Sequence, residues 1–287
     1  MKPPMPSATP TWHNDTYAAI SPERPELSVS GKTVIITGAG SGIGRETAIA
    51  FASAGAAKVV LLGRTAASLQ ETASLIPSKT QTSIHAVDIT QEKALQDVAK
   101  SVGKWDILVL AAGYISKPSP IVSTDTDEWW QGFETNVKGT LLAIKSFAPT
   151  ANQARPVVLA VTSGMTAAPA SRLPTLSSYM ASKLALTKMI EFLPVEQPNY
   201  FAATVHPGMV QTAILTKSGG DPNVLPMDKV QLPAHFLVWM SSPEATFLNG
   251  RSVWANWDVE ELKAQAETIQ SGNQMTSGIY GFPFPHM

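Results

Sequence analysis

A glycine-rich run that follows a short β-branched segment constrains the fold of this chain more than any other feature. Residues 33–37 are Thr-Val-Ile-Ile-Thr, and residues 37–44 are Thr-Gly-Ala-Gly-Ser-Gly-Ile-Gly. The residues that follow, 45–53, have the composition and apolar spacing of a helix. A glycine turn between a strand and a helix leaves backbone N–H groups free at the helix N-terminus, where they bind phosphate. The sequence therefore predicts a strand–turn–helix unit that binds a pyrophosphate.

Strand and helix patterns alternate along most of the remaining chain. Further strands are predicted at 58–62, 83–87, 107–110, 156–161 and 201–205. Helices are predicted at 68–75, 91–102 and 126–147, and in the segment around 179–183. Repeated strand-then-helix units predict an α/β fold, a single doubly wound Rossmann-type parallel sheet with helices on both faces.

A tyrosine and a lysine four residues apart supply the candidate chemistry. On a helix, Tyr179 and Lys183 share one face, so the lysine ammonium is expected to lie beside the phenol and lower its pKa. A free tyrosine titrates near ~10, too high for efficient proton transfer at neutral pH. A unit charge at roughly 4 Å contributes about 4 kcal/mol at an intermediate dielectric, so Lys183 and a positively charged nicotinamide together would bring the phenol into range. Beside the glycine run, the pair indicates a nicotinamide-dependent oxidoreductase.

Composition narrows the classes of partner. The 287 residues, 44% of them hydrophobic, suit one large α/β domain, and a net charge of -1 argues against nucleic acid or an anionic membrane as the main partner. A small-molecule substrate is expected instead. The absence of cysteine excludes disulfides and thiolate chemistry, and the five scattered histidines, His206 included, predict no metal site. No segment reaches the ~18 apolar residues of a membrane span, so we expect a cytoplasmic protein.

The spacing of Gly38, Gly42 and Gly44 is Gly-x-x-x-Gly-x-Gly, and here the chain resembles the short-chain dehydrogenase/reductase family. The resemblance covers about residues 30–258. It implies that Asp88 contacts adenine and that the loop from Pro207 to Thr212 holds the nicotinamide. One departure is plain: the family usually has Asn-Asn-Ala-Gly where residues 110–113 are Leu-Ala-Ala-Gly. Apolar packing is expected to replace the missing amides.

The resemblance also implies a catalytic tetrad of Asn136, Ser163, Tyr179 and Lys183. Tyr179 would be the general acid that protonates a carbonyl oxygen as hydride arrives, or the base in the reverse direction. Ser163 would hydrogen-bond that oxygen. Lys183 would hold the nicotinamide ribose, and Asn136 would organise a water that relays protons to Lys183. A purely structural Asn136 that kinks its helix is the alternative.

The position of the serine leaves an alternative open. Sixteen residues separate Ser163 from Tyr179, where many family members have about thirteen. Thr162 or Thr166 could therefore take the place of Ser163, although an insertion in the loop explains the spacing more simply.

Cofactor choice depends on Arg64. In NAD-preferring folds an acidic residue about 20 positions past the glycines binds the ribose 2′-hydroxyl, and Arg64 occupies that position here. An arginine would pair with a 2′-phosphate, so NADP(H) is preferred and NAD(H) remains possible. Arg45 would either assist or be a solvated helix residue. The glycine run and the resemblance together imply these cofactor contacts: Gly38, Ser41, Gly42, Ile43, Gly44, Arg64, Asp88, Ile89, Ala112, Gly113, Tyr179, Lys183, Pro207, Gly208, Val210 and Thr212.

The expected activity is reduction of a ketone or aldehyde of an apolar small molecule to an alcohol. Candidate substrate contacts are Tyr114, Met165, Met209, Ile214 and Leu215, with Trp129 and Trp130 at the rim. Motifs in the N- and C-terminal segments resemble those of filamentous-fungal members tied to secondary metabolism. The alternatives are an NAD-dependent alcohol dehydrogenase and a cofactor-binding redox-sensing or scaffold protein without turnover. Family members associate through the helices that carry Asn136 and Tyr179, which implies a homodimer or homotetramer.

Three segments are expected. Residues 1–30 carry six prolines and would form an extended arm pinned by its aromatic residues. Residues 31–258 would form the Rossmann-fold catalytic domain, with a substrate flap at 211–232 where glycines and prolines interrupt the pattern. Residues 259–287 would form a helix and a tail packed on the domain through Tyr280, Phe282 and Phe284.

Overall fold

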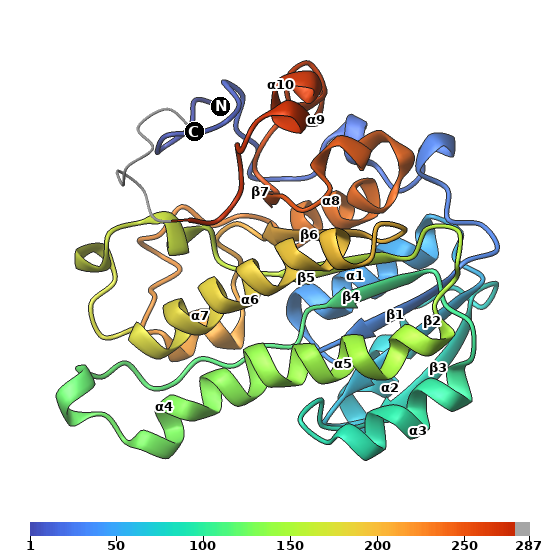
Figure 1. The fold of residues 1–287 in the computed structure, drawn as a ribbon, viewed down its shortest axis with the longest axis horizontal. Helices are drawn as coiled ribbons and strands as arrows, with labels where there is room; N and C mark the ends of the chain where they lie inside the picture. The colour runs from blue at the N-terminus through green and yellow to red at the C-terminus, as the bar shows by residue number, and fades with distance from the viewer. Residues whose placement is uncertain (279–287) are drawn as a thin grey trace.

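A single parallel sheet of seven strands organises the molecule (Figure 1). The structure, a computed structural model, describes residues 1–278, so Tyr280, Phe282 and Phe284 lie outside the described residues. The strand order is β3-β2-β1-β4-β5-β6-β7, which confirms the predicted Rossmann-type fold. The strands are β1 (Thr33–Thr37), β2 (Lys58–Gly63), β3 (Gln81–Ala86), β4 (Ile107–Leu110), β5 (Val157–Val161), β6 (Phe201–His206) and β7 (Ser252–Trp254). The order reverses between β1 and β4, and ligands of such sheets bind in the crevice beyond the strand ends at that point.

Helices cover both faces of the sheet. One face packs against α1 (Gly42–Ser53), α2 (Ala66–Ser74) and α8 (Gln231–Ser241). The other face packs against α3 (Glu92–Val102), α5 (Thr140–Phe147) and α6 (Ser177–Glu196). The other α-helices of the described residues are α4 (Thr126–Phe133), α7 (Ala213–Lys217), α9 (Val259–Lys263) and α10 (Ala266–Ser271).

The predicted helix over 126–147 is continuous, but its middle part is π-helical. It consists of α4, the π-helical segment η4 (Glu134–Gly139) and α5. Asp125 caps its start, because its side chain accepts a hydrogen bond from the Glu128 N–H at 2.8 Å. A π-helical turn within an α-helix shifts the direction of the side chains around it and frequently marks a functional site.

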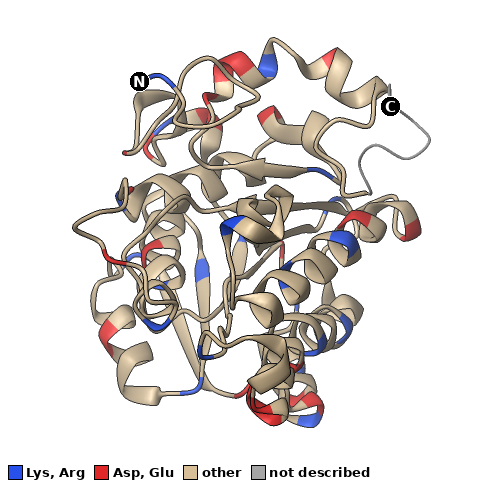
Figure 2. Ribbon diagram, turned by 90° about the vertical axis from the view of Figure 1, so that its left-hand side faces the viewer, with Lys and Arg blue, Asp and Glu red and all other residues tan. Residues whose placement is uncertain are grey.

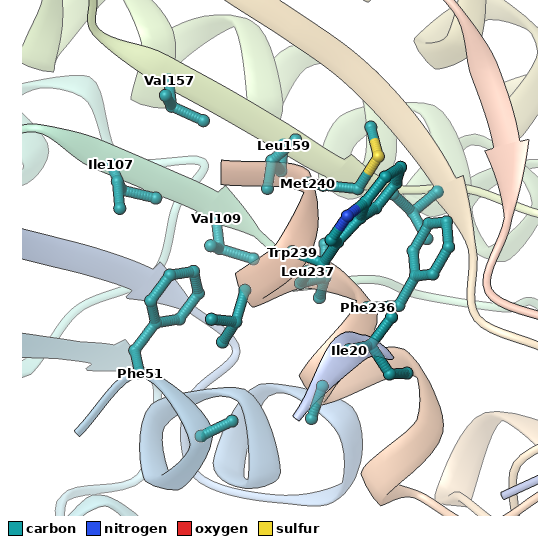
Figure 3. Packing of buried hydrophobic residues seen from close by; sticks show 14 of the residues in the cluster. Ile20, Phe51, Ile107, Val109, Val157, Leu159, Phe236, Leu237, Trp239 and Met240 are labelled. Atoms are coloured by element: carbon teal, nitrogen blue, oxygen red, sulfur yellow. The ribbon is translucent and has the colours of Figure 1, made fainter. Parts of the chain in front are cut away.

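The largest hydrophobic cluster lies between the sheet and α8. Figure 3 shows Val109 and Leu159 from the sheet facing Leu237 and Trp239 of α8, with Phe51 of α1 beside them. All the residues from Leu232 to Ser241 except His235 are buried. The predicted flap over 211–232 therefore contains α7, and its last two residues are already the start of α8.

The N-terminal arm contributes to this core. Trp12 is buried, forms an antiparallel bridge with Trp257 and meets the Trp254 ring edge-on at 5.8 Å between centroids. His13 Nε2 lies 2.9 Å from an Asp258 carboxylate oxygen. The arm is thus attached to the end of β7 and to the loop that follows it.

Charged residues are spread over the molecule. Figure 2 shows Lys and Arg interspersed with Asp and Glu along the helices and loops. Within residues 1–278, no helix is both long enough and apolar enough to cross a membrane. Those residues also contain no cluster of three or more His, Asp or Glu side chains that could hold a metal ion.

Candidate active site

The glycine run forms a tight cradle at the start of α1. Gly38 and Gly42 have φ values of +68° and +51°, in the left-handed region that favours glycine. A Cβ on Gly38 would lie 2.8 Å from Cα of Ala112, and one on Gly44 would lie 2.7 Å from the carbonyl carbon of Gly38. The Ser41 side chain makes no capping bond to α1, so the N–H groups of the first turn are left for an anion. This geometry fits the pyrophosphate of a dinucleotide.

Arg45 braces this cradle from outside. Its Nη2 donates to the carbonyl oxygen of Gly40 at 2.7 Å and pairs with Glu71 at 2.8 Å, while its Nε donates to Thr72 at 3.1 Å. Arg45 is therefore not a solvated helix residue: it ties the glycine loop to α2.

Arg64 and Asp88 lie just after neighbouring strands. Arg64 follows β2, is exposed, and makes no hydrogen bond or ion pair with another residue of the described chain. Asp88 follows β3, and its Oδ1 accepts bonds from Thr90 N (2.9 Å) and Thr90 Oγ1 (2.8 Å). Ile89 is buried against Gly139, where a Cβ would lie 2.7 Å from Ile89 Cγ1. Because parallel strands end at one edge of a sheet, Arg64 and Asp88 lie on the same edge as the glycine run.

Asn136 and Lys183 converge on Gly113. A Cβ on Gly113 would lie 3.6 Å from Asn136 Oδ1 and 3.6 Å from Lys183 Nζ. Asn136 is fully buried in η4, and its amide grips the backbone of Tyr114, donating to the carbonyl and accepting from the N–H at 2.8 Å each. Its Nδ2 also donates to Ser182 Oγ at 2.9 Å. The π-helical segment thus places an asparagine between the end of β4 and α6.

Burial controls the two titratable members of the predicted tetrad. Lys183 is 3% exposed, and its Nζ donates to the carbonyl of Val161 at 2.7 Å. Burial lowers the pKa of Lys183 to about 8 and raises the pKa of the Tyr179 phenol to about 12. The ammonium lies 5.8 Å from the centroid of the Tyr179 ring. The expectation that Lys183 lowers the Tyr179 pKa is therefore wrong in this structure, because desolvation raises the pKa and no lowering by Lys183 accompanies it.

The three hydroxyl candidates before α6 differ in their partners. Thr162 Oγ1 is 2.7 Å from Thr187 Oγ1 and donates to the Lys183 carbonyl at 3.3 Å. Thr166 Oγ1 donates to the Ser163 carbonyl at 2.8 Å. The Ser163 hydroxyl bonds to no other residue among 1–278, although Ser163 is only 8% exposed. Of the three hydroxyls, that of Ser163 is the one left to meet a ligand.

The loop after β6 reaches the glycine cradle. Thr212 caps α7 by accepting from the Leu215 N–H at 3.4 Å, and its Cγ2 would lie 3.3 Å from a Cβ on Gly42. Ile214 of α7 would lie 3.5 Å from a Cβ on Gly113. Pro207 and Gly208 come directly after β6, and Val210 is buried. The structure thus brings the predicted loop, the cradle and Gly113 together.

His206, at the end of β6, is a packing residue. Burial lowers its pKa to about 3, and its ring meets Trp254 edge-on at 4.5 Å between centroids. The imidazole is neutral at neutral pH.

The predicted substrate contacts separate into two groups. Met165 lines a groove of about 460 Å³ between the loops that follow β4 and β5, whereas Tyr114, Met209, Ile214 and Leu215 are not among its lining residues. The groove is lined by Ser119, Pro120, Ile121, Val122, Met165, Thr166, Ala168, Pro169, Ala170, Leu173, Pro174, Thr175, Leu176, Ser177, Met180, Ala181 and Leu184. It was not foreseen from the sequence, although its walls are a visibly apolar stretch of the β5–α6 loop.

Tyr114 is held by a polar cluster that the sequence did not reveal. Its hydroxyl accepts from Lys217 Nζ at 3.0 Å and donates to Glu128 at 3.3 Å. Lys217 also pairs with Glu128 at 3.1 Å. The cluster connects α7 of the flap to α4. Trp129, predicted at the rim, donates from its indole to Ser177 Oγ at 3.0 Å, whereas Trp130 is exposed.

Apolar packing replaces the amides at the family's usual Asn-Asn-Ala-Gly position. Leu110 is buried on one face of the sheet, and Ala111 and Ala112 pack against the clusters on opposite faces. The Ala112 N–H donates to Thr37 Oγ1 at 3.1 Å, which ties the end of β4 to β1. The departure leaves the edge of the sheet intact.

Comparison with known proteins gives consistent matches. A family model described as short chain dehydrogenase matches residues 32–223. The short chain dehydrogenase mpl6 of Monascus purpureus is 35% identical over 286 residues, covering 94% of this chain and 97% of its own. The short chain dehydrogenase/reductase AacuD of Aspergillus aculeatus is 30% identical over 277 residues, covering 94% and 96%. Among solved structures, a Shigella flexneri short chain dehydrogenase complexed with NADP superposes with a TM-score of 0.71 at 22% identity, over 81% of this chain and 99% of that one.

Proposed function

Because the chain belongs to the short-chain dehydrogenase/reductase family, we propose that it is an NADP(H)-dependent oxidoreductase that reduces a ketone or aldehyde of an apolar small molecule to an alcohol. The observation that carries the proposal is the convergence of Asn136 and Lys183 on Gly113, at the strand edge that also holds the glycine cradle. Tyr179 precedes Lys183 by one helical turn, and Ser163 offers an uncommitted hydroxyl at the end of β5.

The residues at the strand edge fit a dinucleotide. The cradle of Gly38, Gly42 and Gly44 would hold the pyrophosphate, and the loop from Pro207 to Thr212 would hold the nicotinamide. NADP(H), when bound, supplies or accepts the hydride. Arg64 supports the choice of NADP(H), because an exposed guanidinium without a partner among the described residues is free to bind a 2′-phosphate. A structural neighbour complexed with NADP has the same fold.

Tyr179 would act as the general acid in the reductive direction. With its pKa raised to about 12, the phenol stays protonated at neutral pH and can donate its proton. The alkoxide that develops from a carbonyl is a stronger base than a phenolate, so this transfer is favourable. Ser163 would donate a hydrogen bond to the same oxygen and fix its position.

Most hydrogen-bonding groups of the Asn136 side chain already have protein partners, which limits how it can bind a water. Both N–H groups of its amide are used by Tyr114 and Ser182, and one lone pair of Oδ1 accepts from the Tyr114 N–H. The second lone pair of Oδ1 has no partner among the described residues, and Oδ1 and Lys183 Nζ would each lie 3.6 Å from a Cβ on Gly113. A water that relays protons to Lys183 would therefore donate to this lone pair. The same amide also organises the π-helical segment, so the catalytic and structural roles considered for Asn136 are compatible.

The surroundings support an apolar substrate and an oligomer. The groove beside Met165 has aliphatic walls, including Leu173 and Leu176, and suits an aromatic or polycyclic ketone better than a charged one. The fungal relatives favour a role in secondary metabolism. The helices expected to associate carry exposed apolar side chains, namely Trp130, Leu141, Leu184, Phe192 and Val195. Burial of these side chains would favour a homodimer or homotetramer.

Calorimetric titration with NADPH and with NADH at equal salt tests the cofactor assignment. NADPH should bind at least about tenfold tighter, a difference of ~1.4 kcal/mol, and Arg64→Ala should abolish the difference. Arg172→Ala, which removes another exposed arginine, is the matched control and should leave the ratio unchanged. Equal affinities in the parent protein would contradict the role of Arg64 and favour an NAD-dependent alcohol dehydrogenase.

Turnover tests the reaction. With NADPH and a panel of aromatic and polycyclic ketones, the parent protein should oxidise NADPH, and Tyr179→Phe should lose this activity while its NADPH affinity stays within about twofold. Tight cofactor binding without turnover on any panel member would favour the cofactor-binding protein without catalysis. Retained turnover in Tyr179→Phe would refute the proton-transfer role.

A further inference from the structure

The flap that follows β6 is closed at its base by one side chain, that of Asp228. The carboxylate accepts a hydrogen bond from the Met209 N–H at 2.6 Å, and the Asp228 N–H donates to the Met209 carbonyl at 2.8 Å. Val210 and Asp228 also form an isolated parallel bridge. Both backbone polar groups of Met209 are therefore held by Asp228, nineteen residues further along the chain.

The turn before Met209 is shaped around the same carboxylate. Gly208 has a φ of +81°, which only glycine adopts without strain. A Cβ on Gly208 would lie 3.0 Å from Cγ of Asp228 and closer still to its Oδ2, so no other residue fits while the carboxylate is in place. The conformation of the turn and the position of Asp228 depend on each other.

The N-terminal arm anchors this base to the body. The Lys229 N–H donates to the carbonyl of Asn14 at 2.8 Å. Asn256, next to the core, donates to the carbonyl of His13 at 2.9 Å, and the His13 N–H donates to the carbonyl of Asn256 at 2.8 Å. Asp228 is thus directly followed by a residue that a backbone hydrogen bond ties to the N-terminal arm.

We propose that Asp228 is a positioning residue, which fixes the turn from Pro207 to Met209 so that the nicotinamide end of the cofactor is presented to Tyr179. The inference rests on the proposed function, in which this turn holds the nicotinamide. The glycine cradle binds the other half of the cofactor at a different strand end, so Asp228 acts on alignment much more than on affinity.

This division predicts a split between binding and turnover. In Asp228→Ala, kcat should fall by about 10- to 100-fold, because small misplacements of a reacting group carry penalties of that order. The Kd for NADPH should change by less than about threefold, since the pyrophosphate contacts remain. Asp228→Asn keeps an oxygen acceptor for the Met209 N–H. Its decrease in log kcat should be no more than half of the decrease seen for Asp228→Ala. Asp221→Asn is the matched control, because Asp221 is exposed in the same flap and, among residues 1–278, its carboxylate bonds only to Asn223. In this variant kcat should be unchanged.

Amide hydrogen exchange gives a second measurement that needs no turnover. In the parent protein and in Asp221→Asn, the Met209 amide should be protected, and in Asp228→Ala its exchange should speed up by at least about tenfold. The exchange of α1 should not change, which distinguishes a local release from general loss of stability. Unchanged Met209 exchange in both Asp228 variants would overturn the proposal, and so would faster exchange with an unchanged kcat.

The two hypotheses can fail separately. If the parent protein neither binds nor turns over NADPH, the proposed function fails and the positioning role falls with it, while the exchange data still decide whether Asp228 holds the turn. If the parent protein is active and the Asp228 variants lose NADPH affinity in step with kcat, the proposed function stands and the positioning role is refuted.

Discussion

The substitution Gly44→Ala tests whether the backbone of the glycine cradle excludes a Cβ at position 44 or can shift to accommodate one. Gly44 is the third residue of α1 and has no positive φ, so helix propensity alone favours alanine there by about 1 kcal/mol. The structure opposes this gain. The added Cβ would lie 2.7 Å from the carbonyl carbon of Gly38, nearer still to its oxygen, and 3.2 Å from Cα of Ala39. All of these are backbone atoms, which cannot rotate away.

The neighbouring Gly40→Ala is the matched control. A Cβ there would lie 2.5 Å from Ser68 Oγ, the mobile end of an otherwise small side chain, and Gly40 also has no positive φ. A change of the Ser68 rotamer moves Oγ away, and the remaining contact, 3.2 Å to Ser68 Cβ, needs a shift of only a few tenths of an ångström. Overpacking against an unyielding site costs about 1–3 kcal/mol. Contacts as short as those at Gly44 belong at the upper end of this range, and the gain in helix propensity offsets about 1 kcal/mol of the cost. We therefore expect the free energy of unfolding to fall by roughly 2 kcal/mol for Gly44→Ala and by less than about 0.5 kcal/mol for Gly40→Ala.

Urea unfolding followed by tryptophan fluorescence measures both variants, since the chain has seven tryptophans. Titration with NADPH should show a loss of at least about tenfold for Gly44→Ala, because relief of the clash displaces the loop that would hold the pyrophosphate. Equal stability and equal NADPH affinity for the two variants would refute the argument, and the close approach of α1 to Gly38 would then not be a hard constraint.

Three further predictions concern pH, the arm and the flap. The pKa of Lys183 falls from 10.5 to about 8 on folding, so between these pH values the unfolded chain binds more protons than the folded protein. The free energy of unfolding should therefore rise with pH in this window, by up to ~1.4 kcal/mol per pH unit. Urea unfolding at two pH values in the window should show a smaller rise for Lys183→Met than for the parent protein. Trp12→Ala should destabilise the protein by about 3–5 kcal/mol in the same assay, because the ring is 7% exposed and packs on Trp254, whereas a dispensable arm would show almost no change. Lys217→Ala should change stability by less than ~1 kcal/mol, since the side chains of Lys217 and Glu128 are 40% and 35% exposed, yet it should speed amide exchange in α7; unchanged exchange would mean that the pair does not hold the flap.

The strands near the cradle were predictable because their sequences leave little choice. Residues 33–37, 58–62 and 107–110 are short apolar runs rich in Val, Ile and Leu, as expected of parallel strands buried on both faces. The predicted segment 107–110 matches β4, and 58–62 differs from β2 by one residue. Their order, with β1 between β2 and β4, follows from right-handed crossovers in a doubly wound fold.

Two elements escaped prediction for different physical reasons. The sequence of α8, Gln-Leu-Pro-Ala-His-Phe-Leu-Val-Trp-Met-Ser, is apolar on nearly every side, so it lacks the amphipathic period that marks a surface helix. Its position between the sheet and the arm explains this composition, since almost every side chain is buried. The strand β7 has only three residues and exists through its pairing with β6, a long-range contact that no local pattern encodes.

The site was predictable where chemistry depends on residue type, and not where it depends on backbone geometry. The spacing of Asn136 within its helix gave no sign of the π-helical segment, because that change concerns the register of backbone hydrogen bonds. Asp228 was missed because it is an ordinary acidic residue in a region of low regularity. Its role comes from the fold, which returns the chain to Met209 after the flap.

The coupling of Tyr179 and Lys183 shows the limit of arguments from spacing. Four residues on a helix do place the two side chains on one face, but the ammonium is 5.8 Å from the ring centroid and is held by the Val161 carbonyl. Burial opposes both charged forms, so it raises the phenol pKa and lowers that of the amine. The oxidised nicotinamide of NADP⁺ carries a positive charge, which would lower the phenol pKa where it binds beside Tyr179, as the proposed function requires. Spectrophotometric titration of the phenol should then give a lower pKa with NADP⁺ than with NADPH, because only the oxidised nicotinamide is positively charged. Identical phenol pKa values with the two forms would mean that the nicotinamide charge does not reach Tyr179.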